Sequence, residues 1–238
     1  MYRRLEVLPT RSAVEERVAA ELLAVVQSSL DSRGRADIAV TGGTVGIGTL
    51  AAVARSPLVA IVDWSRVHVW WGDERFVPAG NSERNEQQAR DALFSHVAIP
   101  EANLHMFPTD NGQTVEQARD EFLAEHVDGF PAFDVVLNGI GPDGHAASLF
   151  PGLPHGEGHD VIAVANSPKP PAKRLSFTFD ALNRGERVWI VASGSDKSVA
   201  VARIIADSPE SETPAAALCG VMETVVWIDA DAASAVSI

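Results

Sequence analysis

The stretch FDVVLNGIGPDGHAASLFP, residues 133–151, decides which fold class we expect for this chain. It begins with an apolar run, residues 133–137, that is typical of a buried strand. The run leads into a glycine-rich loop that carries Asp143 and His145. Enzymes of the α/β class place reactive side chains in this way, in loops at the carboxyl edge of a parallel sheet. The plainer alternative is a tight turn in which Asp143 caps a helix and His145 is an incidental surface residue.

Helical and strand patterns alternate along the rest of the sequence. Capping boxes at Ser12–Glu15 and Thr114–Gln117 predict two helices, the first ending near Gly34 and the second near Val127. The first helix should bury Val14, Val18, Leu22, Leu23 and Val26 on one face. Short apolar runs predict strands at 38–40, 67–71, 133–137, 161–164, 175–179, 188–191 and 225–228. We therefore expect a single α/β domain over residues 1–238, with a mainly parallel sheet and helices on both faces.

The bulk composition favours a cytoplasmic protein. Hydrophobic residues make up 46% of the 238 positions and charged residues 21%, which is ordinary for a soluble domain. No apolar stretch reaches the ~18 residues that a membrane span needs. The first six residues lack the apolar core of a signal peptide, and the single cysteine, Cys219, fits a reducing compartment.

The net charge is −13, and it argues against nucleic acid and anionic membranes as partners. An anionic small molecule would need a local cluster of cations set against this field. Such a cluster is present in the sequence. Lys169, Lys173 and Arg174 lie in a proline-stiffened segment. Lys197 lies at a helix start, where a cation opposes the helix dipole, so it is a better candidate for binding a ligand than for stabilising the helix.

Two further loops follow predicted strands and are candidates for ligand contacts. The first contains Gly42, Gly43 and Thr44 and precedes a helix from about Val45 to Ala54, whose exposed N–H groups suit a phosphate. No P-loop or G-x-G-x-x-G frame fits these glycines, so nucleotide binding is not expected. The glycines can alternatively serve only the turn and the helix packing.

The second of these loops contains Asp73, Glu74 and Arg75. Arg75 either forms a surface ion pair with its acidic neighbours or makes a bidentate contact with a phosphate or carboxylate. Arg75 completes the predicted basic cluster, which comprises Arg75, Lys169, Lys173, Arg174 and Lys197. His155 and His159 flank Glu157, but no third strong ligand accompanies them, so no metal site is expected.

Taken together, these motifs resemble the 6-phosphogluconolactonase family, within the superfamily that also holds the glucosamine-6-phosphate deaminases. The resemblance covers nearly the whole chain, with the motifs in the family's order. The matching segments are TGGT at 41–44, WGDERFV at 71–77, NSERN at 81–85, GIGPDGHAASLFPG at 139–152, SPKPP at 167–171 with RLS at 174–176, and GSDK at 194–197.

The resemblance implies a Rossmann-like single domain that hydrolyses 6-phospho-D-glucono-1,5-lactone to 6-phosphogluconate without a metal or an organic cofactor. It implies that His145 acts as general base and then general acid, with Asp143 fixing its tautomer. Asp73 is either catalytic or positions Arg75. The implied phosphate-binding residues are Gly42, Gly43, Thr44, Arg75, Lys169, Arg174 and Lys197. The expected partner is the sugar-phosphate lactone alone, bound by a monomer or small homo-oligomer.

Two other functions are weighed against hydrolysis of the lactone. A sugar-phosphate deaminase of the same superfamily resembles Asp-Gly-His-Ile-Ala-Phe-Asn-Glu at this loop, with a glutamate five residues after the histidine. Phe150 stands at that position here, which disfavours deamination. A non-catalytic sugar-phosphate sensor would carry a DNA-binding segment, and the sequence has no basic recognition segment of that kind.

Overall fold

A seven-stranded parallel sheet forms the centre of the computed structural model, which describes residues 3–236. The strand order is β1-β10-β9-β6-β2-β3-β5, and every neighbouring pair is parallel. The strands are β1 (Arg4–Leu8), β2 (Ala36–Val40), β3 (Val67–Trp71), β5 (Leu104–His105), β6 (Val135–Gly139), β9 (Arg187–Ala192) and β10 (Glu223–Asp229). The predicted parallel α/β fold is confirmed, and five of its strands were predicted from apolar runs.

A second, antiparallel sheet corrects part of the prediction. It has the order β4-β8-β7, with β4 at Asp73–Arg75, β7 at Val161–Val164 and β8 at Arg174–Phe177. Two of the predicted strands, 161–164 and 175–179, therefore belong to this sheet and not to the parallel one. Residues 73–75 were expected to be a loop, but the backbone of this segment pairs with β8 and is a short strand.

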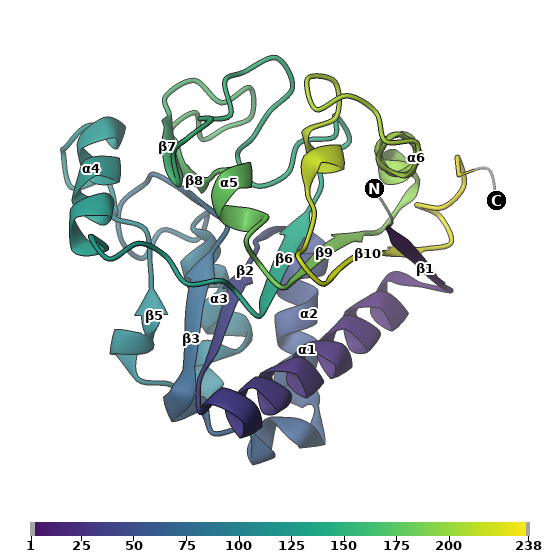
Figure 1. The fold of residues 1–238 in the computed structure, drawn as a ribbon, viewed down its shortest axis with the longest axis horizontal. Helices are drawn as coiled ribbons and strands as arrows, with labels where there is room; N and C mark the ends of the chain where they lie inside the picture. Colours follow the sequence, from purple (N-terminus) through teal and green to yellow (C-terminus); the bar gives the residue numbers. More distant parts are fainter. Residues whose placement is uncertain (1–2, 237–238) are drawn as a thin grey trace.

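Helices cover both sides of the parallel sheet (Figure 1). They are α1 (Arg11–Arg33), α2 (Gly43–Arg55), α3 (Asn85–Ala92), α4 (Val115–Glu125), α5 (Phe179–Leu182) and α6 (Ser198–Ile205). Helices α1 and α2 pack together against the sheet, and α3 packs on α2. Helices α4 and α5 contact the small sheet instead, so Figure 1 shows them beside β7 and β8.

The cap of α1 differs from the prediction, whereas its buried face does not. The predicted apolar residues Val14, Val18, Leu22, Leu23 and Val26 are all buried. The helix is capped by Thr10, whose side chain accepts a hydrogen bond from the Ala13 N–H, so Ser12 is not the cap. Ser12 instead donates to Glu16 one turn later. The second predicted capping box is confirmed, because Thr114 and Gln117 bond reciprocally at the start of α4.

All strands of the main sheet run in one direction, so their carboxyl ends lie at a single edge. Loops that follow β2, β3, β6 and β9 therefore emerge side by side. Within residues 3–236, no helix is long and apolar enough to cross a membrane. The expectations about the chain's first residues and about a domain spanning 1–238 also concern residues 1, 2, 237 and 238, which lie outside the described part.

Candidate active site

His145 is held by a carboxylate and an ammonium group on one side of its ring. Its Nδ1 lies 2.6 Å from Asp143 Oδ1, and Lys169 Nζ lies 3.1 Å from the same carboxylate oxygen. Lys169 Nζ is also 3.2 Å from His145 Nδ1, but two donors cannot share one hydrogen bond. We assign the proton to Nδ1, because the shorter contact is to an acceptor. The opposite nitrogen, Nε2, then carries the lone pair.

The surroundings of His145 favour its neutral form. Burial of the ring lowers its pKa below the ordinary value, Asp143 raises it, and Lys169 lowers it again, with a net decrease. Burial by itself would raise the pKa of Asp143, but the hydrogen bonds and charges of His145 and Lys169 outweigh burial and hold that pKa low. At neutral pH the pair is therefore an uncharged imidazole oriented by an ionised carboxylate, which is the state that a general base requires.

The absence of a side chain at Gly141 allows Asp143 and His145 to lie together. A Cβ on Gly141 would lie 2.0 Å from His145 Nδ1 and 2.2 Å from Asp143 Oδ1, so only glycine fits there. The Gly141 N–H donates to the His145 carbonyl across the loop, at 3.0 Å. Ala147, which follows, has a φ of 49°, a left-handed conformation that is uncommon for a residue with a side chain. The geometry supports the prediction that Asp143 orients the ring.

Asp73 is a buried hydrogen-bond acceptor at the centre of the site. Its Oδ2 accepts from the Ser148 hydroxyl at 2.6 Å and lies 3.7 Å from Arg174 Nη1. Its Oδ1 accepts from Asn85 Nδ2 at 3.2 Å. Ser148 and Asn85 lie in the matched segments 139–152 and 81–85, but neither was named as a site residue, because their hydrogen bonds to Asp73 join segments far apart in the sequence. Together they fix the orientation of the Asp73 carboxylate.

Arg75 is not paired with its acidic neighbours. Its Nη1 donates to the Glu83 carbonyl at 3.1 Å and to Asn85 Oδ1, and its buried Nε has no hydrogen-bond partner among the described residues. Glu74 points elsewhere: its carboxylate accepts from backbone N–H groups at the start of α3 and lies 3.8 Å from the buried Arg84. The surface ion pair considered for this loop is therefore not formed by Arg75, which instead lines the smaller of the two cavities described below.

Arg174 organises the proline-rich segment as well as lining the site. It donates to the carbonyls of Lys169, Pro170 and Pro171 at 3.2–3.3 Å, and its guanidinium lies over the Phe150 ring. These bonds hold the segment so that Lys169 reaches Asp143. Lys169 was predicted to bind phosphate, and in this structure it contacts the Asp143–His145 pair. Lys173, another member of the predicted basic cluster, is exposed.

Two adjoining cavities collect the remaining predicted residues. The smaller, about 120 Å³, is lined by Thr41, Gly42, Gly43, Asp73, Arg75, Asn85, Gly139, Ile140, His145, Ala147 and Arg174. The larger, about 420 Å³, is lined by Arg11, residues 42–46, Gly139, Ile140, residues 191–194, Asp196 and Lys197. The loop residues Gly42, Gly43, Gly139 and Ile140 border both cavities. The predicted His145 loop, glycine loop and Lys197 thus meet at one edge of the sheet.

The start of α2 lies within the larger cavity. Gly42 is its N-cap and makes no side-chain cap bond, so the first N–H groups of the helix are available to an anion. A Cβ on Gly42 would lie 1.8 Å from Asn85 Oδ1, so the close approach of this loop to Asn85 requires glycine. Lys197 Nζ lies 3.1 Å from Asp196 Oδ2 and is the cation nearest to this opening from the β9 loop.

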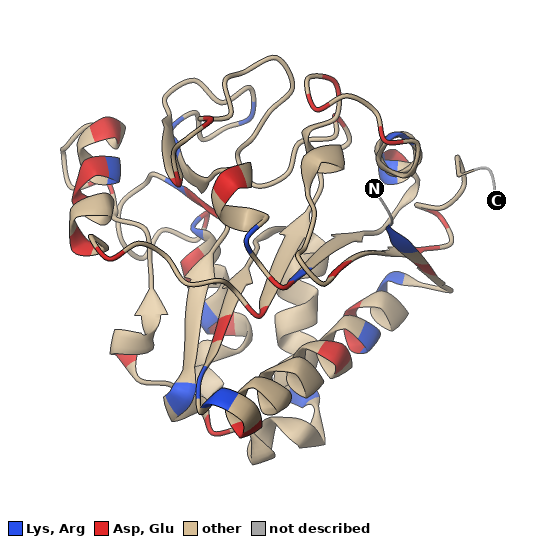
Figure 2. Cartoon of the chain, viewed as in Figure 1, with Lys and Arg blue, Asp and Glu red and all other residues tan. Residues whose placement is uncertain are grey.

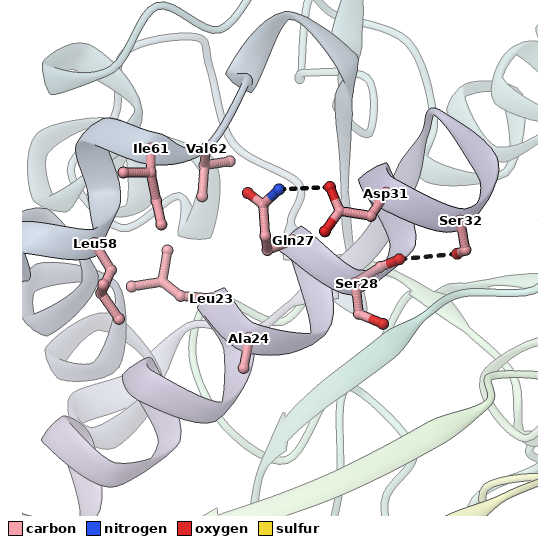
Figure 3. A pocket seen from close by; sticks show the side chains of 9 residues that line it. All are labelled: Leu23, Ala24, Gln27, Ser28, Asp31, Ser32, Leu58, Ile61 and Val62. Atoms are coloured by element: carbon pink, nitrogen blue, oxygen red, sulfur yellow. Dashed lines mark hydrogen bonds between the residues drawn. The ribbon is translucent and has the colours of Figure 1, made fainter.

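A third cavity, of about 580 Å³, lies between α1 and the segment Pro57–Ile61 (Figure 3). Leu23, Leu58 and Ile61 form its apolar end, and Gln27 bonds Asp31 at its polar end. It contains no cation and no acid–base pair, so it does not fit a sugar phosphate. Among residues 3–236 no group of three or more His, Cys, Asp and Glu side chains is placed to hold a metal ion. His155 bonds Glu210 and the Phe150 carbonyl through its two ring nitrogens.

The fold and the site are those of an α/β enzyme that works at the carboxyl edge of a parallel sheet. The family model for glucosamine-6-phosphate isomerases and 6-phosphogluconolactonases matches residues 9–227, and the chain belongs to this family. The family resemblance inferred from the motifs is thereby confirmed, and the protein is an enzyme.

Curated relatives and solved structures agree with this assignment. The 6-phosphogluconolactonase of Mycobacterium leprae is 41% identical over 225 residues, which cover 90% of each chain. That of Mycobacterium tuberculosis is 36% identical and covers 97% of each chain. The crystal structure of 6-phosphogluconolactonase from Thermotoga maritima superimposes with a TM-score of 0.85, at 25% identity, over 96% of this chain and 100% of that one.

Proposed function

We propose that this enzyme hydrolyses 6-phospho-D-glucono-1,5-lactone to 6-phosphogluconate, a step of the oxidative pentose phosphate pathway. One observation carries the proposal: a neutral, carboxylate-oriented imidazole borders the smaller cavity, and a cation and helix N–H groups border the adjoining one. A lactone with a phosphate on its tail needs this combination, a proton acceptor at one end and an anion site at the other. The activity of the curated relatives agrees with it.

His145 Nε2 removes a proton from water as the water oxygen attacks C1 of the lactone. The carbonyl π electrons move to its oxygen, and the tetrahedral intermediate forms. Arg75 and Arg174 border the same cavity and stabilise the negative charge on that oxygen. When the C1–O5 bond breaks, the protonated His145 returns the proton to the departing ring oxygen. The product carboxylic acid then ionises, so each turnover releases one proton to solvent.

Asp73 serves as a positioning residue in this mechanism. All of its observed partners are protein donors: Ser148, Asn85 and Arg174. Asp73 also positions Arg75 through Asn85. The amide nitrogen of Asn85 donates to Asp73, and the amide oxygen accepts from Arg75. This arrangement keeps both guanidinium groups at the wall of the cavity that Asp73 also lines.

The substrate phosphate occupies the larger cavity, against Thr44, the first N–H groups of α2 and Lys197. The positive end of the helix dipole and the lysine both favour a phosphate dianion. Because the two cavities share the loops at Gly42 and Gly139, a single molecule can span them. Binding the phosphate then fixes C1 opposite His145 and raises the rate through orientation.

Deamination is disfavoured by the side chain at position 150. Phe150 is fully buried, its ring centroid lies 4.6 Å from that of His145, and Arg174 lies over its face. No carboxylate stands where the deaminase branch of the superfamily carries a glutamate. The protein should therefore release acid from the lactone and no ammonia from glucosamine 6-phosphate.

The direct test is a coupled assay with freshly generated lactone, corrected for its spontaneous hydrolysis. Wild-type protein should accelerate acid release, and His145→Ala should reduce kcat by about 10²–10⁴, the usual contribution of a general acid–base group. The affinity of the variant for 6-phosphogluconate, measured by calorimetry, should stay within about threefold of wild type, because the phosphate contacts are intact. Near-normal turnover by His145→Ala would refute the role of this histidine.

A further inference from the structure

Arg11, at the start of α1, borders the larger cavity together with residues 42–46 and Lys197. Nothing in the sequence motifs pointed to this residue, because α1 precedes the first glycine loop and carries no site residue of its own. Its side chain is 58% exposed and therefore has room to move. The packing of α1 on α2 brings it to the mouth of the cavity that holds the N-terminus of α2.

Arg11 is engaged by a carboxylate on its own helix. Its Nε lies 3.4 Å from Glu15 Oε1, one turn further along α1. Glu15 is largely buried against α2: a Cβ on Gly48 would lie 2.2 Å from Glu15 Oε1. This carboxylate is fixed in the contact between the two helices, so it tethers the mobile guanidinium beside the cavity.

We propose that Arg11 binds the phosphate of the substrate, and that Glu15 competes with the phosphate for the Arg11 guanidinium. The inference rests on the proposed function and adds a specificity-determining residue to it. A phosphate ester carries about −1.5 to −2 charges at pH 7 and three acceptor oxygens, so it outcompetes a single carboxylate. The guanidinium fork also matches phosphate geometry better than an edge contact with Glu15 does.

The other cation at this cavity, Lys197, is also paired with a neighbouring carboxylate. Asp196 is 64% exposed and pairs with Lys197, as Glu15 pairs with Arg11. Each of these two cations at the phosphate end thus has a neighbouring carboxylate. An uncharged sugar lactone cannot displace these carboxylates, whereas a phosphorylated one can, so the arrangement selects for the phosphate.

The chain provides a matched control on the same helix. Arg17 pairs with Glu21 at 2.8 Å, also at i,i+4, and its side chain is 57% exposed, but it does not border the cavity. Arg11→Gln and Arg17→Gln therefore remove the same charge and the same kind of ion pair, one at the cavity and one away from it. Both should fold normally, and any loss of Tm should be larger for Arg17→Gln, because Arg17 also lies 6.0 Å from the Trp227 ring centroid.

Steady-state kinetics on the phospholactone and calorimetric binding of 6-phosphogluconate test whether Arg11 binds the phosphate. Arg11→Gln should raise KM and Kd by about 5-fold to 10-fold, the size of a half-exposed charged hydrogen bond, with kcat within about twofold of wild type. Arg17→Gln should leave all three unchanged. Glu15→Gln should lower Kd, since Arg11 is then released from its competitor.

The inference is overturned if Arg11→Gln binds and turns over like wild type, or if Arg17→Gln weakens binding equally, which would indicate a general effect of charge. Those outcomes leave the proposed function standing when wild type is active. A wild-type enzyme that does not accelerate hydrolysis above the spontaneous rate would remove the proposed function, and this inference with it.

Discussion

His145 lies between two opposite charges, and their balance sets the pH at which it can act. Asp143 raises the pKa of the imidazole, whereas burial and Lys169 lower it. The base must be unprotonated, so kcat/KM should rise with pH through the pKa of His145 and then level off. Because the net shift is downward from the ordinary value, the plateau should extend to pH values below neutrality.

Replacing Asp143 and replacing Lys169 should shift the rising, acidic limb of the pH profile in opposite directions. Asp143→Asn removes the charge that raises the pKa of His145, so the limb should shift to lower pH while the plateau rate falls because the ring loses its orientation. Lys169→Met removes the charge that lowers the pKa, so the limb should shift to higher pH. The two shifts should have opposite signs, because the two neighbours carry opposite charges. Profiles of log(kcat/KM) against pH measure both, and shifts in the same direction would contradict the charge assignment.

At this scale the sequence predicted the residues that stand within one motif. Asp143 and His145 are two positions apart, so the loop that contains them also brings them together. Ser148, Asn85 and Arg11 were missed because their roles depend on packing between distant segments. Ser148 contacts Asp73 across 75 positions of sequence, and no local pattern encodes that contact.

Among the elements, the loop after β6 depends on the absence of a side chain at Gly141. Any Cβ there would overlap both His145 and Asp143. The neighbouring Gly72, between β3 and β4, differs: a Cβ on it would meet its nearest atom, Asn138 Oδ1, at an ordinary 3.6 Å. Neither residue has a positive φ, so an alanine at either position tests space alone.

Gly141→Ala should therefore reduce kcat by about 100-fold, the cost of displacing catalytic groups by about 1 Å. Gly72→Ala should retain most of the activity. Circular dichroism and thermal unfolding would verify that both variants are folded. If Gly141→Ala were as active as Gly72→Ala, the enforced contact between Asp143 and His145 would not matter for the reaction.

The elements that sequence reasoning missed are short or polar. Strand β4 has the sequence DER and becomes a strand only because its backbone pairs with β8. Strand β5 is two residues long, and β1 is half exposed at the sheet edge, so neither has an apolar run to reveal it. The central strands β2, β6 and β9 are buried on both faces, and their continuous apolar runs predicted them correctly.

Across the whole molecule, charge is distributed so that cations gather where the loops meet. Figure 2 shows acidic residues spread over α1, α4 and α5, consistent with the net charge of −13. Arg75, Arg174 and Lys197 border the two cavities of the site. The parallel topology creates this convergence, because it sends the loops after β2, β3, β6 and β9 to one edge. The sequence predicted that edge correctly, but not the second sheet that closes one side of it.

An aromatic cluster at the β3–β5 edge should make the fold sensitive to acid. His105 stacks on Trp70, with ring centroids 3.9 Å apart, and bonds His68. Burial and the neighbouring His68 and His126 lower the pKa of His105 to about 4. The unfolded chain binds a proton at about pH 6.5, so stability should fall as the pH drops from 6.5 toward 4.

His105→Phe should flatten that decline, because phenylalanine keeps the stack on Trp70 and cannot be protonated. The free energy of unfolding, obtained from urea titrations at several pH values, measures the slope. His159→Gln, at an exposed position outside the cluster, is the control. An unchanged slope in His105→Phe would mean that this histidine does not contribute to acid lability.

The position of a bound product tests the central claim most directly. A crystal structure with 6-phosphogluconate should place a C1 carboxylate oxygen about 2.6–3.2 Å from His145 Nε2, the hydrogen-bond reach of a general base. The phosphate should lie against the first N–H groups of α2 with Lys197. A phosphate bound instead by Arg75 and Arg174 in the smaller cavity, or a C1 group remote from the imidazole, would contradict the account.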